Sequence, residues 1–121
     1  MIRALFLFVF FAIPALAQEE AAETTVGTGA MLRGLDKING ELVDYELRPG
    51  EHIVHGALTV KLEECRYPTE NPNGDAFAFL EIYTDTSEGP VFRAWMVASS
   101  PALSALDHPR YDIWVLRCTI E

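Results

Sequence analysis

Short segments in which apolar and polar residues alternate recur along most of the chain, and residues that favour turns separate them. Between Glu41 and Leu47, for example, Val43, Tyr45 and Leu47 alternate with acidic or other residues. A period of two residues is typical of a β-strand with one buried face. The run Ala76–Thr84 is apolar on both parities, which predicts a central strand covered on both sides. No segment has the length and periodicity of a long helix, so the pattern predicts an all-β fold.

Turn signals divide these segments at intervals of about 8–12 residues. Asn39-Gly40 favours a tight hairpin because both turn positions want positive φ. Pro49-Gly50 has the residue order of a type II turn. The run Tyr67–Asp75 is rich in proline, asparagine and glycine and predicts a loop. We therefore expect about seven short strands in a small antiparallel β-sandwich or partly open barrel.

The stretch Phe92–Cys118 holds both tryptophans and predicts a strand, one short helical turn and a second strand. Ser100 and Pro101 have the residue types of a helix N-cap and a first helical position. Leu103 and Leu106 are three residues apart, so in a helical turn both would face the core.

The phase of the strands bears on where the cysteines lie. Cys65 is out of phase with the apolar residues that alternate over positions 58–62. Either a β-bulge at Glu63-Glu64 turns Cys65 inward, or its disulfide lies on the outer face of the sheet. In the last strand, simple alternation places Cys118 on the same face as Trp114.

The N-terminal residues have the pattern of a cleavable signal peptide. Arg3 precedes a continuous apolar run over residues 4–13, and a small-x-small tripeptide ends at Ala17. The run is shorter than the about 20 residues of a membrane-spanning helix, and a retained anchor is the alternative. We expect residues 1–17 to be removed, 18–29 to be a flexible acidic leader and 30–121 to form a single β domain without a membrane span.

The chain is acidic, with a formal net charge of −9 that becomes −10 when Arg3 is removed with the signal peptide. Such a surface argues against nucleic acid and anionic lipid headgroups as partners. It permits a basic protein partner or a cation, whereas a solvated acidic surface needs no partner.

Cys65 and Cys118 are the two cysteines of the chain, and they lie 53 positions apart. Two cysteines in an exported protein are most simply one disulfide. On the chain-entropy model, closing a loop of this length stabilises a fold by about 4 kcal/mol. A redox-active pair is the alternative, and the absence of C-x-x-C spacing disfavours it.

Three stretches carry a resemblance to a known family: GLDKINGELVDYELRPGE, LEECRYP and, above all, FRAWMVASSPALSALDHPRYDIWVLRC. Nearly the whole range from Gly29 to Cys118 resembles a small exported family of alphaproteobacteria that is catalogued only as a domain of unknown function. Other members tend to have Ser-Gly before the tryptophan, where this chain has Arg93-Ala94, so a role for a glycine at that place is in doubt here.

The resemblance implies a periplasmic location and the pairing of Cys65 with Cys118. It implies no activity. The resemblance also implies a gene that sits near one for a small accessory subunit of respiratory NADH dehydrogenase, and this association points to an envelope or respiratory complex.

Residue types of a nucleophilic triad occur in the last quarter of the chain: Ser99, Ser100, Asp107 and His108. Asp107 and His108 are adjacent, so their side chains diverge, and no G-x-S-x-G elbow presents a serine. The serines are better explained as a helix N-cap, and the Asp-His pair as residues that end the helical turn. We therefore predict no catalytic residue.

Metal ligands were sought at His52, His55 and His108, and Glu70–Asp75 faintly resembles a calcium-binding loop. In a strand, positions 52 and 55 point to opposite faces. Pro72 and the missing terminal glutamate depart from the calcium pattern. We expect no metal and no cofactor.

Aromatic side chains are the remaining candidates for binding, although the core is the favoured place for these rings. The alternative places one tryptophan and Tyr67 at a surface groove, where partners dock. The candidate surfaces are the Ser99–Tyr111 segment and the Tyr67–Asp75 loop. The candidate binding residues are Trp95, Ser99, Ser100, Asp107, His108, Tyr111 and Tyr67.

The function expected from the sequence is a non-enzymatic periplasmic binding or accessory module with a protein partner in the cell envelope, associated with an envelope or respiratory membrane complex. The alternative is a small periplasmic metal-dependent or hydrolytic enzyme that uses Asp107 and His108.

Overall fold

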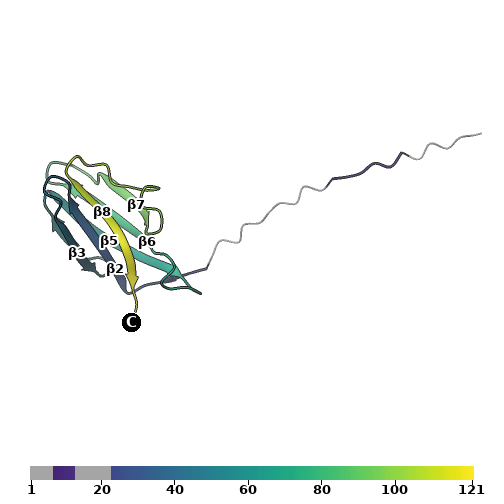
Figure 1. The fold of residues 1–121 in the computed structure, drawn as a ribbon, viewed down its shortest axis with the longest axis horizontal. Helices are drawn as coiled ribbons and strands as arrows, with labels where there is room; N and C mark the ends of the chain where they lie inside the picture. Colours follow the sequence, from purple (N-terminus) through teal and green to yellow (C-terminus); the bar gives the residue numbers. More distant parts are fainter. Residues whose placement is uncertain (1–6, 13–22) are drawn as a thin grey trace, which may run out of the picture.

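The computed structural model describes residues 7–12 and 23–121, and the second range folds into two packed antiparallel sheets (Figure 1). The five-stranded sheet contains β1 (Thr24–Val26), β4 (His52–His55), β5 (Leu58–Pro68), β6 (Phe77–Thr84) and β7 (Phe92–Val97). The three-stranded sheet contains β2 (Gly29–Asp36), β3 (Leu42–Leu47) and β8 (Tyr111–Thr119). The described residues contain no helix, and the predicted all-β sandwich is confirmed.

β5 is the longest strand, and the five-stranded sheet is organised around it because three other strands pair with it. Its first residues pair with β4 and its last three pair with β1, while β6 pairs along its other side and β7 pairs with β6. In the second sheet, β2 lies between β3 and β8. The core between the sheets consists mainly of aliphatic side chains. Its largest fully buried members are Leu32, Leu47, Leu58, Leu62, Leu80, Ile82, Ile113, Val60, Val115 and Cys65.

Within the range expected as a flexible leader, residues 24–26 and residue 29 lie in strands. Thr24–Val26, which falls within the predicted leader at 18–29, forms β1 and pairs with Arg66–Pro68 of β5. Residues 1–6 and 13–22, which include most of the expected signal peptide and its cleavage site, lie outside the described residues. Among the residues that are described, no helix is long and apolar enough to cross a membrane.

The two predicted turns have different outcomes. At Pro49-Gly50, the Glu51 N–H donates to the Arg48 carbonyl and Gly50 has φ 86°, as a type II turn requires. At Asn39-Gly40, only the glycine has positive φ, and the Gly40 N–H donates to the Asp36 carbonyl. The predicted hairpin forms, since β2 pairs antiparallel with β3, but a loop wider than a two-residue turn joins the two strands.

The helical turn predicted after β7 is a single hydrogen-bonded turn and not a helix. Residues 98–99 and 101–103 lie in turns, and the Leu103 N–H donates to the Ser100 carbonyl. Leu106 is buried as expected, whereas the Leu103 side chain is 77% exposed. A single turn that lies along the edge of a sandwich can bury one apolar residue but has no second helical turn to direct another inward.

β6 is covered on one side only. Ala78, Leu80 and Ile82 are completely buried in the core, while Phe77 and Phe79 lie on the outer face and remain partly exposed. The apolar residues on both parities thus do not mark a strand covered on both sides. They mark a sheet with an apolar outer surface.

Two β-bulges turn both cysteines into the core. The register between β5 and β6 shifts between Leu62 and Glu64, so Glu63 is an extra residue and Cys65 faces inward. The bulge alternative for Cys65 is therefore confirmed. On β8, Leu116 is the extra residue, because Met31 pairs with Arg117 and Leu32 with Val115. The alternation that placed Cys118 beside Trp114 is wrong for this reason.

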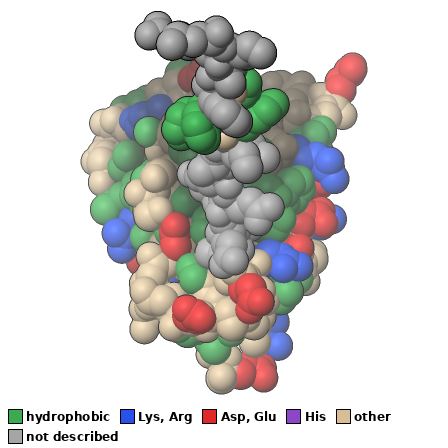
Figure 2. Space-filling model, turned by 90° about the vertical axis from the view of Figure 1, so that its right-hand side faces the viewer, with side chains coloured by type: hydrophobic (Ala, Val, Ile, Leu, Met, Phe, Trp, Pro, Cys, Tyr) green, Lys and Arg blue, Asp and Glu red, His purple; other side chains and the backbone are tan. Residues whose placement is uncertain are grey.

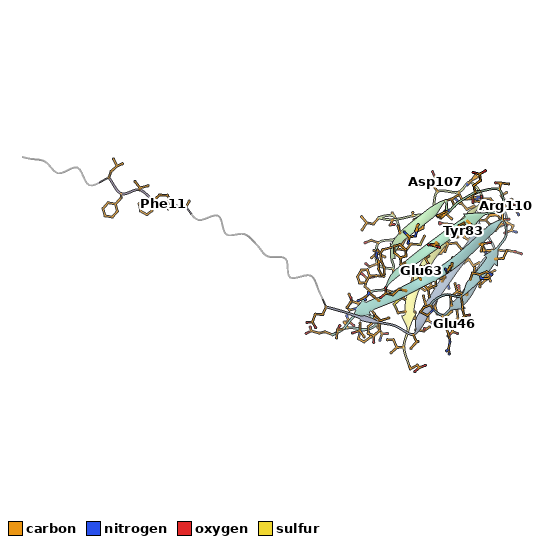
Figure 3. The ribbon with its side chains drawn as sticks, turned by 180° about the vertical axis from the view of Figure 1, so that it is seen from behind. Phe11, Glu46, Glu63, Tyr83, Asp107 and Arg110 are labelled. Atoms are coloured by element: carbon orange, nitrogen blue, oxygen red, sulfur yellow. A yellow bond between two sulfur atoms is a disulfide. The ribbon has the colours of Figure 1, made fainter. Side chains whose placement is uncertain are left out.

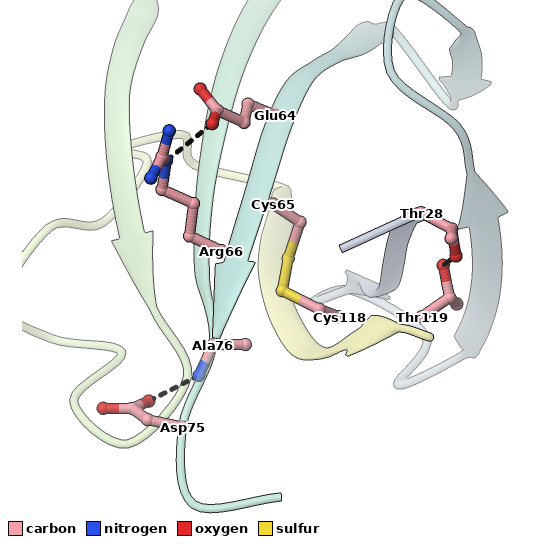
Figure 4. Close-up of a disulfide and its surroundings, with 8 residues drawn as sticks. All are labelled: Thr28, Glu64, Cys65, Arg66, Asp75, Ala76, Cys118 and Thr119. Carbon is pink, nitrogen blue, oxygen red and sulfur yellow. Dashed lines mark hydrogen bonds and ion pairs between the residues drawn. A yellow bond between two sulfur atoms is a disulfide. The ribbon is translucent and has the colours of Figure 1, made fainter. Parts of the chain in front are cut away.

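The disulfide between Cys65 and Cys118 joins the two sheets across the core, with the Cα atoms 5.7 Å apart (Figure 4). It links β5 of one sheet to β8 of the other, and both half-cystines are buried. The predicted pairing is confirmed.

At the opposite end of the sandwich, Gly56 allows a close approach between the sheets. Gly56 has φ 59°, and a Cβ atom at this position would collide with the ring of Tyr111 at the start of β8. Gly40 also has positive φ, but no atom lies within 4 Å of a Cβ built there. A comparison of alanine substitutions at the two glycines therefore separates the free-energy cost of backbone strain from that of a steric collision.

Removal of both cysteines tests how much the sheets depend on this link. We expect Cys65→Ala/Cys118→Ala to lower the free energy of unfolding by about 4 kcal/mol, because the unfolded chain loses its cross-link. Urea denaturation of both proteins measures the difference, and alkylation with mass spectrometry should find no free thiol in the wild type. A loss below about 1 kcal/mol would show that the disulfide is dispensable.

Alanine at the two glycines tests the close approach. Gly40→Ala should cost about 1 kcal/mol, as left-handed backbone strain does. Gly56→Ala should cost clearly more, because the same strain is joined by displacement of the Tyr111 ring. Thermal unfolding of the two variants beside the wild type makes the comparison, and equal losses would mean that the ring of Tyr111 moves away at no cost.

Candidate functional site

The two loops expected as interaction surfaces meet at Asp75 and Ser99. Asp75 Oδ2 accepts a hydrogen bond from Ser99 Oγ at 2.7 Å, and Asp75 Oδ1 accepts from the N–H groups of Ser99 at 3.0 Å and Ala76 at 2.8 Å. The loop after β5 is thus tied to the turn after β7. These hydrogen bonds occupy both carboxylate oxygens, which favours a structural role for Asp75 and Ser99.

The environment of Asp75 shifts its acidity. Burial raises the pKa of the Asp75 carboxyl, but hydrogen bonds from the Ser99 hydroxyl and from the Ala76 and Ser99 amides outweigh it, so the pKa is lowered overall. A shallow depression of about 420 Å³ adjoins this contact. Its lining includes Leu116, the extra residue of the bulge on β8, and Arg117.

Asp107 and His108 do not join Ser99. His108 Nδ1 accepts hydrogen bonds from the backbone N–H groups of Arg110 and Tyr111, both at 3.1 Å, so the imidazole stabilises the turn into β8. Asp107 is exposed and makes no hydrogen bond or ion pair within the described residues 23–121. Asp107 and Arg110 lie near the same end of the sandwich, away from Glu46 (Figure 3). A nucleophilic triad is therefore not assembled from these residues.

Tyr111 is held among other side chains at that end. Its ring contacts the rings of His55 and His108, with centroids 5.4 Å and 5.5 Å apart, and the Arg110 guanidinium lies over it. Arg110 also forms an ion pair of 2.9 Å with Asp36, and this guanidinium lowers the pKa of the Asp36 carboxyl. These contacts give Tyr111 a packing role.

His55 is a buried residue whose environment the sequence did not reveal. Its Nδ1 shares a hydrogen bond of 2.7 Å with the Tyr45 hydroxyl, and its Nε2 is buried without a partner in the described chain. The ring lies against Gly34, where a Cβ would stand 2.6 Å from the imidazole. Within the described residues, no group of three or more His, Cys, Asp and Glu side chains is placed to hold a metal.

Tyr67 and Trp95 lie on opposite faces of the five-stranded sheet. Tyr67 packs against the core, whereas Trp95 is 38% exposed on the outer face. Trp114 is more covered, beside a depression of about 310 Å³ that Pro101 and Ala102 also line. Ser100 is exposed, and its side chain makes no hydrogen bond within the part of the chain described. Of the candidate residues, Trp95 is the aromatic one most open to solvent.

Strand pairing places further aromatic and charged residues around Trp95. We call Phe77, Phe79 and Trp95, with Arg66 and Arg93, the aromatic face. Trp95 pairs with Phe79, and their rings meet edge to face with centroids 5.3 Å apart. Phe77 pairs with Arg66 on one side and Val97 on the other. The arrangement gathers apolar rings on the outside of the sheet, where solvent reaches them.

Ion pairs flank these rings. Arg66 Nε donates to Glu64 at 2.6 Å, and Arg93 Nε donates to Glu81 at 2.8 Å. The Arg93 guanidinium also lies over the Phe79 ring, 5.3 Å from its centroid. Hydrogen bonds from Arg93 and the Tyr83 hydroxyl lower the pKa of the Glu81 carboxyl. The charges beside Trp95 are thus fixed in place.

Sequence reasoning found Trp95 and missed its neighbours. Phe77 and Phe79 alternate with three fully buried residues of β6, and this alternation was the available signal that they face outward. The contribution of Arg66 depends on a strand register that the bulge at Glu63 shifts by one residue, and that of Arg93 depends on the regular pairing of β7 with β6. Figure 2, which views the molecule from the right-hand side of Figure 1, shows hydrophobic side chains intermingled with both signs of charge.

The fold and this face define a small disulfide-bonded β-sandwich with an exposed aromatic surface. The chain belongs to a family described as "Uncharacterized protein conserved in bacteria", domain of unknown function 2155, whose model matches residues 30–118. It is 30% identical over 111 residues to an uncharacterised protein of Rickettsia prowazekii (strain Madrid E). The matched region covers 87% of this chain and 72% of the Rickettsia protein. The resemblance seen in the sequence is confirmed. No solved structure matches the chain.

Replacement of the two serines tests the link between the loops. We expect Ser99→Ala to raise the pKa of Asp75, because one of the hydrogen bonds that lower it is lost. Ser100→Ala, the adjacent control, should leave this pKa unchanged. NMR titration of the Asp75 carboxyl carbon measures both.

The same titration fixes the pH dependence. Because the pKa of Asp75 is lowered in the folded protein, its contribution to stability is complete above the ordinary value of 3.8 and is lost as the pH falls through the lowered value. Equal pKa values in the wild type and in Ser99→Ala would contradict the link.

Proposed function

We propose that the chain is a non-enzymatic binding module of the bacterial cell envelope, located in the periplasm, that docks a partner protein on its aromatic face. The exposure of Trp95 beside Phe79 carries the proposal. Tryptophan, tyrosine and arginine are the residues that most often supply the binding energy of protein interfaces. The face combines one such tryptophan with two arginines.

The surroundings of Trp95 support the same conclusion. Phe79 contacts the tryptophan ring, and the side chains of Arg93 and Glu81 are held by their ion pair. Side chains that are already ordered lose little conformational entropy when a partner binds. An apolar surface flanked by fixed polar groups therefore favours association over a purely structural role for these rings.

The disulfide and the N-terminal sequence together support the periplasmic location. Disulfides persist in oxidising compartments and are rare in the cytosol, and the link between Cys65 and Cys118 is buried between the sheets. The signal-peptide pattern of residues 1–17 supports export to the periplasm. Association with an envelope or respiratory membrane complex is part of this proposal.

A quantitative pull-down tests the proposal. The tagged full-length chain is expressed in its host, cross-linked and purified from solubilised envelope, and partners are quantified by mass spectrometry. Trp95→Ala should reduce the recovered partner about 30-fold, as loss of 2 kcal/mol at an interface does. Thermal unfolding confirms that the variant remains folded.

Leu103→Ala is the matched control, since Leu103 is an exposed apolar residue on the Ser99–Tyr111 segment. It should leave recovery unchanged. If Leu103→Ala abolishes recovery and Trp95→Ala does not, the partner docks on that segment and the aromatic face is the wrong surface.

A further inference from the structure

A groove lies beside Trp95 on the aromatic face. It has a volume of about 250 Å³, and Thr24, Arg66, Phe77 and Trp95 line it. Its accessible lining is apolar, so the methyl group of Thr24 and the aliphatic stem of Arg66 complete a surface that the two rings begin. An apolar cavity of about 150 Å³ accommodates benzene. The groove therefore has room for one large aliphatic or aromatic side chain.

The guanidinium groups that flank the groove have unused donors. Arg66 donates from Nε to Glu64 and from Nη1 to Thr24 Oγ1, and Arg93 donates from Nε to Glu81. An arginine has five N–H donors in a planar fork that suits a carboxylate. Within the described residues, the other donors of both forks make no hydrogen bond.

Arg93 is the most exposed charged residue in the ion pairs that flank the aromatic rings. The Arg93 side chain is 60% exposed, whereas its partner Glu81 is 14% exposed. Residues 23–121 contain 8 basic and 16 acidic residues, and 3 of each form the ion pairs of this sheet, so 5 basic and 13 acidic residues remain elsewhere. An acidic ligand is thus repelled by most of the domain and meets an exposed cation beside Trp95.

The spacing of these groups matches an extended chain. Arg93 and Trp95 are two residues apart on the same face of β7. Same-face side chains in a strand repeat every about 6.6 Å. A partner segment in extended conformation would present side chains two residues apart at the same interval.

We propose that the aromatic face binds an extended acidic segment of a partner protein. One bulky apolar side chain of the segment enters the groove beside Trp95, and a carboxylate two residues away pairs with Arg93. This inference rests on the proposed function and names the chemistry of the partner. A neutral glycan and a second copy of the chain are the other possible occupants, and the experiment separates them.

Selection from a random peptide library tests the pattern. Displayed 12-residue peptides are selected on the immobilised wild-type chain and depleted on Trp95→Ala. We expect enrichment of sequences with a large apolar residue and, two positions away, Asp or Glu. A synthetic peptide of the enriched sequence should bind about 10-fold more weakly to Arg93→Glu and more weakly at high salt.

Arg117→Glu is the matched control, because Arg117 is an exposed arginine of the other sheet. It makes the same charge change and should leave peptide affinity unchanged. An enriched basic pattern, unaltered affinity in Arg93→Glu, or no peptide that depends on Trp95 would overturn the inference.

Two further measurements distinguish failure of the acidic-segment inference from failure of the proposed function. Binding of chitin oligosaccharides is followed by tryptophan fluorescence in the wild type and in Trp95→Ala, and self-association of both proteins by sedimentation at increasing concentration. Trp95-dependent glycan binding or dimerisation without peptide binding would overturn the acidic segment and retain the face as a binding surface. Trp95-independent partner recovery in the pull-down would instead overturn the proposed function itself.

Discussion

The disulfide between β5 and β8 ties together the two sheets, and both strands depart from regular geometry to form it. Each strand carries one extra residue two positions before its cysteine: Glu63 on β5 and Leu116 on β8. Without these bulges the regular alternation would direct Cys65 and Cys118 away from the core. The link in turn holds the sheets at one end of the sandwich, while the close packing of Gly56 against Tyr111 holds the other end. The aromatic face lies on the outer side of the five-stranded sheet, whose position these two contacts fix.

The sequence allowed prediction of the fold class, most strands and the cysteine pairing because these depend on local periodicity, turn chemistry and a family resemblance. The turn at Gly50 was found by the same reasoning. At Asn39-Gly40 the hairpin forms with a wider turn than predicted, and at Ser100 a single hydrogen-bonded turn lies where a short helical turn was predicted. The bulge on β8 was missed because nothing in a single strand's alternation marks where an extra residue is inserted.

The candidate site was less accessible to sequence reasoning. Trp95 was among the candidate residues, but its partners come from β5 and β6, and only the strand register brings Arg66, Phe77 and Phe79 to it. A one-residue shift of register would exchange the two faces of a strand. The apolar residues on both parities of β6, read as evidence of a doubly covered strand, instead distinguish an inner face that builds the core from an outer face that is open.

The disulfide between Cys65 and Cys118 determines when the domain reaches its full conformational stability. A contribution of about 4 kcal/mol is a large share of the about 5–15 kcal/mol by which domains of ordinary stability are folded. Before the thiols are oxidised, subtracting this contribution leaves about 1–11 kcal/mol of that range, so the reduced chain has a smaller margin of stability than the oxidised one. Oxidation of Cys65 and Cys118 therefore shifts the equilibrium toward the folded state at the moment the cross-link forms.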